Sequence, residues 1–296
     1  MSKTVSLLSA LMCTFIWGTT FIAQDTGMDA IGPFTFNAVR FLIGFLAILP
    51  LVFFFEIKKF KSELKFDLKT FSKLSFLIGL SLFLGSALQQ VALLYTDVAN
   101  AAFFTIFYVP MVPIIIFIFK RKSLHWSVWP SVILCLVGGY LLTNFYDATV
   151  RLGDTLVILG ALFWSTHIIF TGIIVSKFNL PLTIGAIQTF IVAIFSFFVG
   201  AIYEEFIFEN ILKELDSILY AGVLSGGFAF VLQIYAQKNI SPAPAAIIFS
   251  LEGVFATIAA WFLLDQILGI NNLLGCFFIL CGVLLSQLLP LIRKIN

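Results

Sequence analysis

Two charged residues lie inside long apolar segments of this chain, where an ion is costly. Glu252 lies midway along the segment 242–264, and Arg40 lies within the segment 34–55. A charge at the centre of a membrane costs about 2.5–3.5 kcal/mol on insertion scales, so such residues usually face a bundle interior or a water-filled cavity. Glu252 can take up a proton or pair with a cationic ligand; alternatively, it is a structural partner for Arg40 or a hydrogen-bonded anchor. Arg40 either contacts a ligand or extends toward the membrane surface.

Two polar stripes recur with the same spacing. Side chains at positions i, i+3 and i+7 lie on one face of a helix. Such stripes either line a shared cavity or make helix–helix hydrogen bonds, and the histidine among them is either a protonation site or a neutral, hydrogen-bonded group. The first stripe comprises Trp17, Thr20 and Gln24, and the second comprises Trp164, His167 and Thr171.

A weak internal repeat relates the two halves of the chain. When the second half is laid over the first so that Gln233 falls on Gln89, Gly282 falls on Gly138. Internal repeats in a membrane protein with many spans are typical of alternating-access transporters. The repeat predicts that Gln89 and Gln233 line a shared cavity, and a helix–helix hydrogen bond is the alternative for each. The same superposition matches Ala99, Ala101 and Ala102 with Ala243, Ala245 and Ala246.

Prolines and a glycine weaken the corresponding apolar segment of each half, 99–119 and 242–264. Helices broken near the midplane at corresponding places point to the binding site of a transporter, and an ordinary proline kink is the alternative. Aromatic residues beside the breaks suit apolar or cationic organic ligands. The hinge candidates are Pro110, Pro113, Pro242, Pro244 and Gly253, and the candidate aromatic wall is Phe104 and Tyr108 with Trp17 and Trp164.

Composition indicates which elements position these groups. Hydrophobic residues make up 61% of the 296 residues and charged residues 11%, against about 45–50% and 25% in soluble domains. Such a chain must use lipid as part of its solvent, and a span needs about 20 apolar residues. The sequence predicts ten spans: 5–23, 34–55, 74–95, 99–119, 128–145, 154–175, 182–203, 218–237, 242–264 and 273–291.

The charges between the spans predict their direction. With the N-terminus in the cytoplasm, most of the 17 Lys and Arg residues fall on the cytoplasmic side and the acidic cluster 204–216 falls outside. An even number of spans returns the C-terminus to the cytoplasm. We therefore predict an all-α integral membrane protein, in which residues 1–147 and 148–296 form two inverted five-helix repeats within one transmembrane domain. The lysine-rich segment 56–73 is either an amphipathic stretch on the inner leaflet or a solvated linker.

The sequence offers no signal for a cofactor, a metal or catalysis. The four cysteines lie in apolar runs without metal-site spacing, and no Walker, HExxH or GxSxG motif is present. We expect no enzyme activity, no cofactor and no nucleic-acid partner. The expected partners are a small-molecule substrate and the lipid bilayer, and the oligomeric state stays open. Without an ATP-binding domain, pumping must draw on an ion gradient or on substrate exchange.

Several segments resemble the EamA-type, ten-span transporters of the drug/metabolite transporter superfamily. The most specific is SPAPAAIIFSLEGVFATIAAWFLLDQILG at 241–269. The family commonly has Pro after Ser-Leu-Glu, where this chain has Gly253, which keeps a flexible joint there. Supporting segments are FIWGTTF at 15–21, VRFL at 39–42, ALLYTDVANAAF at 92–103 and GALFWS at 160–165.

The resemblance implies a secondary active transporter, an exporter or exchanger of small metabolites such as amino acids or amines, in a bacterial cytoplasmic (inner) membrane. It would work by alternating access around a central cavity, with Glu252 as the candidate for proton coupling. A passive facilitator or channel-like uniporter for the same solutes is the first alternative, and a membrane-embedded enzyme is less favoured. Phosphorylated substrates are disfavoured because Arg40 is the only Lys or Arg within a predicted span.

Overall fold

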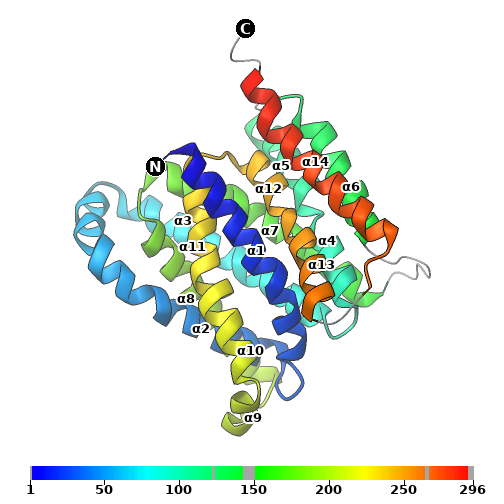
Figure 1. The fold of residues 1–296 in the computed structure, drawn as a ribbon. Helices are drawn as coiled ribbons and strands as arrows, with labels where there is room; N and C mark the ends of the chain where they lie inside the picture. The colour runs from blue at the N-terminus through cyan, green and yellow to red at the C-terminus, as the bar shows by residue number, and fades with distance from the viewer. Residues whose placement is uncertain (1, 122–123, 143–150, 264–266, 293–296) are drawn as a thin grey trace.

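The structure is a computed structural model that describes residues 2–121, 124–142, 151–263 and 267–292. Every regular element in these residues is a helix, which confirms the predicted all-α class (Figure 1). The elements are α1 (Lys3–Thr26), α2 (Pro33–Leu51), the π-helix η1 (Val52–Glu56), α3 (Ile57–Ala92), α4 (Val98–Thr105), α5 (Tyr108–Lys120), α6 (Val128–Leu142), α7 (Leu152–Lys177), α8 (Pro181–Tyr203), α9 (Phe208–Lys213), α10 (Leu215–Leu219), the π-helix η2 (Tyr220–Ala229), α11 (Phe230–Gln237), α12 (Pro242–Phe249), α13 (Leu251–Leu263) and α14 (Ile270–Ile292).

Nine helical stretches within the described residues are long and apolar enough to cross a membrane. The predicted fifth span, 128–145, coincides with α6, which is apolar but has only 15 residues, fewer than the roughly 20 that a span needs. Residues 143–145 of that prediction lie outside the described part of the chain. The span at 128–145, and with it the total of ten, therefore stays a prediction. The nine stretches are Lys3–Thr26, Pro33–Ser62, Asp67–Ala92, Asn100–Phe119, Leu152–Lys177, Pro181–Tyr203, Leu215–Gln237, Pro242–Leu263 and Ile270–Pro290.

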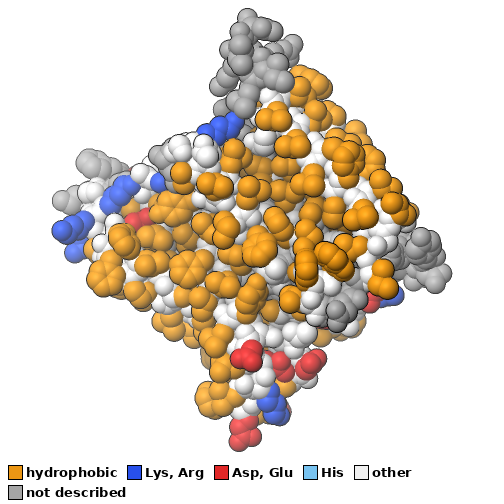
Figure 2. Space-filling model, viewed as in Figure 1, with side chains coloured by type: hydrophobic (Ala, Val, Ile, Leu, Met, Phe, Trp, Pro, Cys, Tyr) orange, Lys and Arg blue, Asp and Glu red, His pale blue; other side chains and the backbone are white. Residues whose placement is uncertain are grey.

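The surface carries the apolar band of a protein that contacts lipid. Figure 2 shows hydrophobic side chains over the middle of the molecule, Lys and Arg along the upper left edge, and Asp and Glu gathered at the lower tip beside α9. Large apolar side chains in the band are strongly exposed, including Phe54 at 82% and Phe119 at 81%. Exposed apolar area on this scale marks a surface that contacts something other than water.

The helices pair across the two halves of the chain. α2 packs against α8, α3 against α7, and α6 against α14, which lies beside it at the right of Figure 1. α1 contacts η2, α11, α12 and α13, all from the second half. The halves therefore interlock, and residues far apart in sequence can meet inside the bundle.

Two glutamates join α2 to α8 at opposite ends of the pair. Glu56, at the end of η1, accepts hydrogen bonds from the N–H and hydroxyl groups of Thr183 in the first turn of α8, at 2.8 and 2.9 Å. Glu204, directly after α8, accepts the corresponding bonds from Thr35 in the first turn of α2, both at 2.7 Å. The start of a helix has unpaired N–H groups and a partial positive charge, so a carboxylate stabilises it. Because each helix caps the other, the two run antiparallel.

The lysine-rich segment 56–73 is helical and continues into the third span. α3 contains one non-helical residue, Asp67, with φ −157° and ψ 57°. The Asp67 carboxylate accepts the N–H of Thr70 at 3.1 Å, as the first residue of a helix does. The span therefore begins at Asp67, earlier than the predicted residue 74, because this cap restarts the helix there.

Candidate functional site

The first of two broken helices separates α4 from α5 at Ile106 and Phe107. Pro110 explains the break, because it has no N–H to bond the carbonyl of Ile106. That carbonyl instead accepts the N–H of Val109 at 2.8 Å, a tighter turn than the α-helix makes. Ile106 is only 1% exposed, so the break lies inside the bundle.

The second broken helix separates α12 from α13 at Ser250. The carbonyl of Ser250 accepts the N–H of Gly253 at 3.2 Å, so this break contains the same kind of tight turn as the first. Laying Gln233 on Gln89 also lays Ser250 on Ile106 and Glu252 on Tyr108. The two halves of the chain thus break at the same position.

The predicted hinge residues take different places around these breaks. Pro110 lies in the first turn of α5 and causes the first break, whereas Pro113 lies within α5. Pro242 is the first residue of α12, where a missing N–H costs nothing, and Pro244 lies in the same turn. Gly253 lies in the first turn of α13, directly after the second break.

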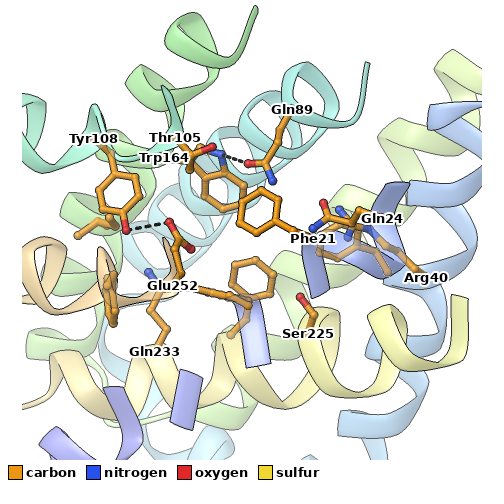
Figure 3. A pocket seen from close by; sticks show the side chains of 15 residues that line it. Phe21, Gln24, Arg40, Gln89, Thr105, Tyr108, Trp164, Ser225, Gln233 and Glu252 are labelled. Carbon is orange, nitrogen blue, oxygen red and sulfur yellow. Dashed lines mark hydrogen bonds between the residues drawn. The ribbon is translucent and has the colours of Figure 1, made fainter. Parts of the chain in front are cut away.

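The two breaks bring Tyr108 and Glu252 into contact. The Tyr108 hydroxyl donates a hydrogen bond of 3.0 Å to the Glu252 carboxylate (Figure 3). The two side chains are 4% and 5% exposed. No salt bridge to Glu252 occurs within the described residues, so a neutral phenol is its hydrogen-bond partner.

A central cavity of about 50 Å³ lies beside this contact (Figure 3). Spans from both halves contribute to its wall. Of the sequence-predicted pathway residues, the structure brings seven together on this wall: Trp17, Arg40, Gln89, Tyr108, Trp164, Gln233 and Glu252.

Arg40 supplies a positive charge to the same wall. Its side chain is 4% exposed and its Nε donates to the Asn37 amide oxygen at 2.8 Å. The guanidinium lies over the rings of Phe36 and Phe41, at 5.2 and 4.8 Å from their centres, where the ring faces attract a cation. Within the described part of the chain it has no carboxylate partner. Arg40 therefore stays inside the bundle and does not extend to the membrane surface.

Aromatic rings form much of the remaining wall. Trp164 stacks on Phe230 with ring centres 6.2 Å apart and an angle of 6°, and its Nε1 donates to the Gln89 amide oxygen at 3.1 Å. Trp17 contacts Phe230 and Phe249, at 5.2 and 5.6 Å between ring centres. The predicted aromatic wall thus forms from Trp17, Tyr108 and Trp164, without Phe104.

Two buried polar atoms on the wall have no partner among the described residues. They are the Trp17 Nε1, which is a donor, and the Gln233 Oε1, which is an acceptor. A buried polar group left unpaired costs about 1–3 kcal/mol. A ligand or water in the cavity would offset that cost, so both atoms are available to hold one.

Three predicted residues lie away from the cavity wall. Thr20 is fully buried and its hydroxyl donates to the carbonyl of Ile16 at 2.6 Å. Phe104 packs in an apolar cluster that includes Phe103. His167 lies behind Gln233, with its Nδ1 3.5 Å from the Gln233 amide nitrogen. Its Nε2 is 3.0 Å from the Gln188 amide oxygen, so His167 is hydrogen-bonded behind the wall, and its role in protonation stays a prediction.

Gln24, the third member of the first polar stripe, also lies on the wall. The other wall residues were not among the predicted candidates. Phe21 lies on the Trp17 face of α1, at i+4, so helical spacing was a usable signal for it. Ser225 lies in η2, where π-helical geometry shifts the register that ordinary helical spacing assumes. The additional wall residues are Phe21, Gln24, Phe41, Thr105, Ile168, Ser225, Phe230 and Phe249.

The described residues hold no cluster of three or more His, Cys, Asp or Glu side chains suited to a metal ion. The wall instead offers one carboxylate, one guanidinium, amides and aromatic faces. These groups can bind and orient an organic molecule. A helical protein whose apolar spans surround a cavity lined by aromatic and polar side chains is an integral membrane protein.

Comparison with known proteins identifies its family. A model of the EamA-like transporter family matches residues 4–144 and residues 151–288, so the chain belongs to that family and is a membrane transporter. An uncharacterized transporter of Archaeoglobus fulgidus is 30% identical over 281 residues, which cover 95% of this chain and 85% of that protein. The uncharacterized transporter YoaV of Bacillus subtilis is 25% identical over 304 residues, which cover 98% and 99%. A crystal structure covers 100% of both chains with a TM-score of 0.81 at 16% identity, a likeness in fold alone.

Proposed function

We propose that this protein is a secondary active transporter for small organic solutes that carry both an amino and a carboxylate group. The observation that carries the proposal is that one cavity is lined by a buried acid and a buried base: Glu252 and Arg40 are both buried and both line it. Glu252 suits an ammonium group and Arg40 a carboxylate. Aromatic faces between them suit an apolar side chain. Simple amines would use Glu252 alone.

The transport cycle we propose is alternating access by two inverted five-helix repeats, with ten spans and both termini in the cytoplasm. Three features support this: the matching breaks in α4–α5 and α12–α13, the excess of Lys and Arg on predicted cytoplasmic segments, and the interlocked helix pairs. We place the protein in a bacterial cytoplasmic membrane as an exporter or exchanger.

Glu252 is the proposed proton-coupling group. A carboxylic acid that faces the cavity from a broken helix can release a proton on one side and take one up on the other. A passive facilitator with the same cavity is the alternative, and it would make Glu252 a binding residue only. A membrane-embedded enzyme is less favoured, because the family model that matches the chain describes transporters.

The test is uptake of radiolabelled amino acids and amines into proteoliposomes, with and without a pH gradient. We expect saturable uptake of one class of amino acid that the gradient enhances. Saturable uptake that ignores the gradient would favour the facilitator. Uptake of amines in preference to amino acids would remove the proposed role of Arg40.

Cysteine labelling tests whether the cavity lies on a water-filled pathway. We expect Gln89→Cys and Gln233→Cys to react with a water-soluble thiol reagent, because both positions line the cavity. Ile78→Cys and Ile234→Cys, on the same two helices, are matched controls. Both isoleucines are fully buried in a separate apolar cluster and should stay unreactive. If the glutamine positions are as inert as the controls, they are packing residues.

A further inference from the structure

A second cavity of about 760 Å³ opens at the end of the bundle where Asp25 and Asp97 lie. Asp97 pairs with Arg151 at 2.7 Å, and their side chains are 69% and 48% exposed, so this end of the cavity meets solvent. We call this cavity the vestibule. In the proposed orientation it lies on the external side. Representative lining residues are Ile22, Thr26, Leu94, Ala102, Thr257 and Asn272.

Phe21 is the one described residue that lines both the vestibule and the central cavity. Its side chain is 2% exposed, and Figure 3 shows it pointing into the central cavity. The lining changes from one cavity to the other at both helix breaks. Thr105 and Glu252 line the central cavity, whereas the next residues, Ile106 and Gly253, line the vestibule. The wall between the cavities therefore includes Phe21 and the residues at the two breaks.

The position of Phe21 is set by a close contact between α1 and α13. At Gly18, one turn before Phe21, an added Cβ would lie 2.6 Å from the Glu252 carbonyl oxygen and 2.7 Å from the Ala256 nitrogen. No side chain fits at such distances, so the two backbones lie directly against each other. A movement of α13 toward α1 at its break would therefore displace α1 at Gly18 and, with it, the ring of Phe21.

We propose that Phe21 is the gate between the central cavity and the vestibule. With the ring in place the cavity is closed toward the Asp25 end, and a solute passes only when the ring moves aside. Lids and gates of this kind commonly set the rate of solute or product release. The proposal rests on the proposed transport function for its biological meaning, but the barrier itself can be measured without any substrate.

The experiment measures access to the central cavity through this wall. Cys13, Cys135, Cys276 and Cys281 are first replaced by Ala, and Ser225→Cys is introduced as a probe that lines only the central cavity. A membrane-impermeant maleimide is added from the Asp25 side of oriented vesicles. We expect Phe21→Ala to raise the labelling rate by about tenfold or more, as expected when a barrier falls by over 1.4 kcal/mol, and Phe21→Trp to lower it.

Controls separate an opened gate from a damaged fold. Phe15→Ala changes another phenylalanine of α1, which is 48% exposed and lines neither cavity, and should leave the rate unchanged. Thr26→Cys, in the vestibule, should label rapidly from the same side in every background. If Phe21→Ala does not fold, Phe21→Leu should give an intermediate rate. If the Ser225→Cys probe is labelled at the same rate in the Phe21, Phe21→Leu and Phe21→Ala proteins, Phe21 is not the gate.

Failure of the gate and failure of the proposed function give different results. A Phe21-dependent labelling rate without saturable uptake of any amino acid or amine supports the gate and removes the proposed substrate class. Saturable uptake with a labelling rate that ignores residue 21 removes the gate and leaves transport in place.

Discussion

Two pairs of helices, each with one member from either half of this transporter, are held together in different ways. The α2–α8 pair is joined at both ends by charged caps, in which Glu56 and Glu204 each accept two hydrogen bonds from one threonine of the opposite helix. The α4–α5 and α12–α13 pair has breaks inside the bundle and a hydrogen bond from Tyr108 to Glu252 there.

The difference follows from where each pair places its backbone polar groups. In the α2–α8 pair the unpaired N–H groups lie at the helix ends, where a carboxylate of the other half satisfies them and resists separation. In the broken pair, backbone groups lose their helical partners inside the bundle, so fewer helical hydrogen bonds resist bending at the breaks. One pair is thus suited to stay fixed and the other to bend, as the proposed alternating-access cycle requires.

The largest expected effect is at the contact in the broken pair. Glu252→Gln keeps the shape of the side chain and its acceptor for Tyr108 but cannot exchange a proton. We expect proton-driven accumulation in proteoliposomes to be abolished, while counterflow exchange continues but needs a higher substrate concentration, because glutamine lacks the charge that would bind the ammonium group. Tyr108→Phe is the matched control, because it removes the hydrogen bond and leaves the carboxylate, and it should retain accumulation. If the Glu252→Gln variant accumulates substrate at the normal rate, Glu252 is not the proton-coupling group.

An intermediate effect is expected at the caps. Glu56→Gln should lower the free energy of unfolding by about 1–2 kcal/mol, the usual loss of a helix cap, read as a lower melting temperature in detergent. Glu204→Gln should cost less because Glu204 is more exposed than Glu56. Both variants should retain counterflow. Glu205→Gln, at the exposed neighbouring position, is the control, and equal melting temperatures for all three variants would contradict the fixed role of α2–α8.

The smallest expected effect is at the joint of α13. Gly253→Ala places a Cβ 3.3 Å from the Ile106 Cδ1, the far end of a flexible side chain that can give way. Stability should change by less than about 1 kcal/mol, whereas the stiffer joint should slow exchange severalfold. Gly44→Ala, where α2 packs on η2, is the comparison: its Cβ would meet the Gly222 carbonyl oxygen at 2.8 Å, so it should lower stability. If the Gly253→Ala variant exchanges substrate at the normal rate, bending at Gly253 is not part of the transport cycle.

Local properties of the sequence predicted much of the fold. Apolar runs gave nine of the predicted spans, because burial in lipid depends mainly on the composition of each helix. Pro110 gave the first break, because a missing N–H acts on its own turn. The second break could be placed only by analogy, since Pro242 and Pro244 begin α12 and do not interrupt it.

The candidate site was partly predictable for the same reason. Glu252, Arg40, Gln89 and Gln233 are polar groups in apolar segments, and the cost of placing them in lipid marks them without any structure. Phe21 carries no such mark among 36 phenylalanines. Its place between two cavities depends on where α1 meets α13. The spacing of residues within one helix does not predict that contact.

By itself the sequence determined that this chain is an all-helical membrane protein with costly polar groups inside its spans, because these properties depend on each segment alone. Only the tertiary structure decided which of those groups share a cavity, that Glu56 and Glu204 cap the opposite helices, and that Thr20, Phe104 and His167 lie behind the wall. Contacts between distant helices depend on shape and close packing over the whole bundle, and no single segment carries that information.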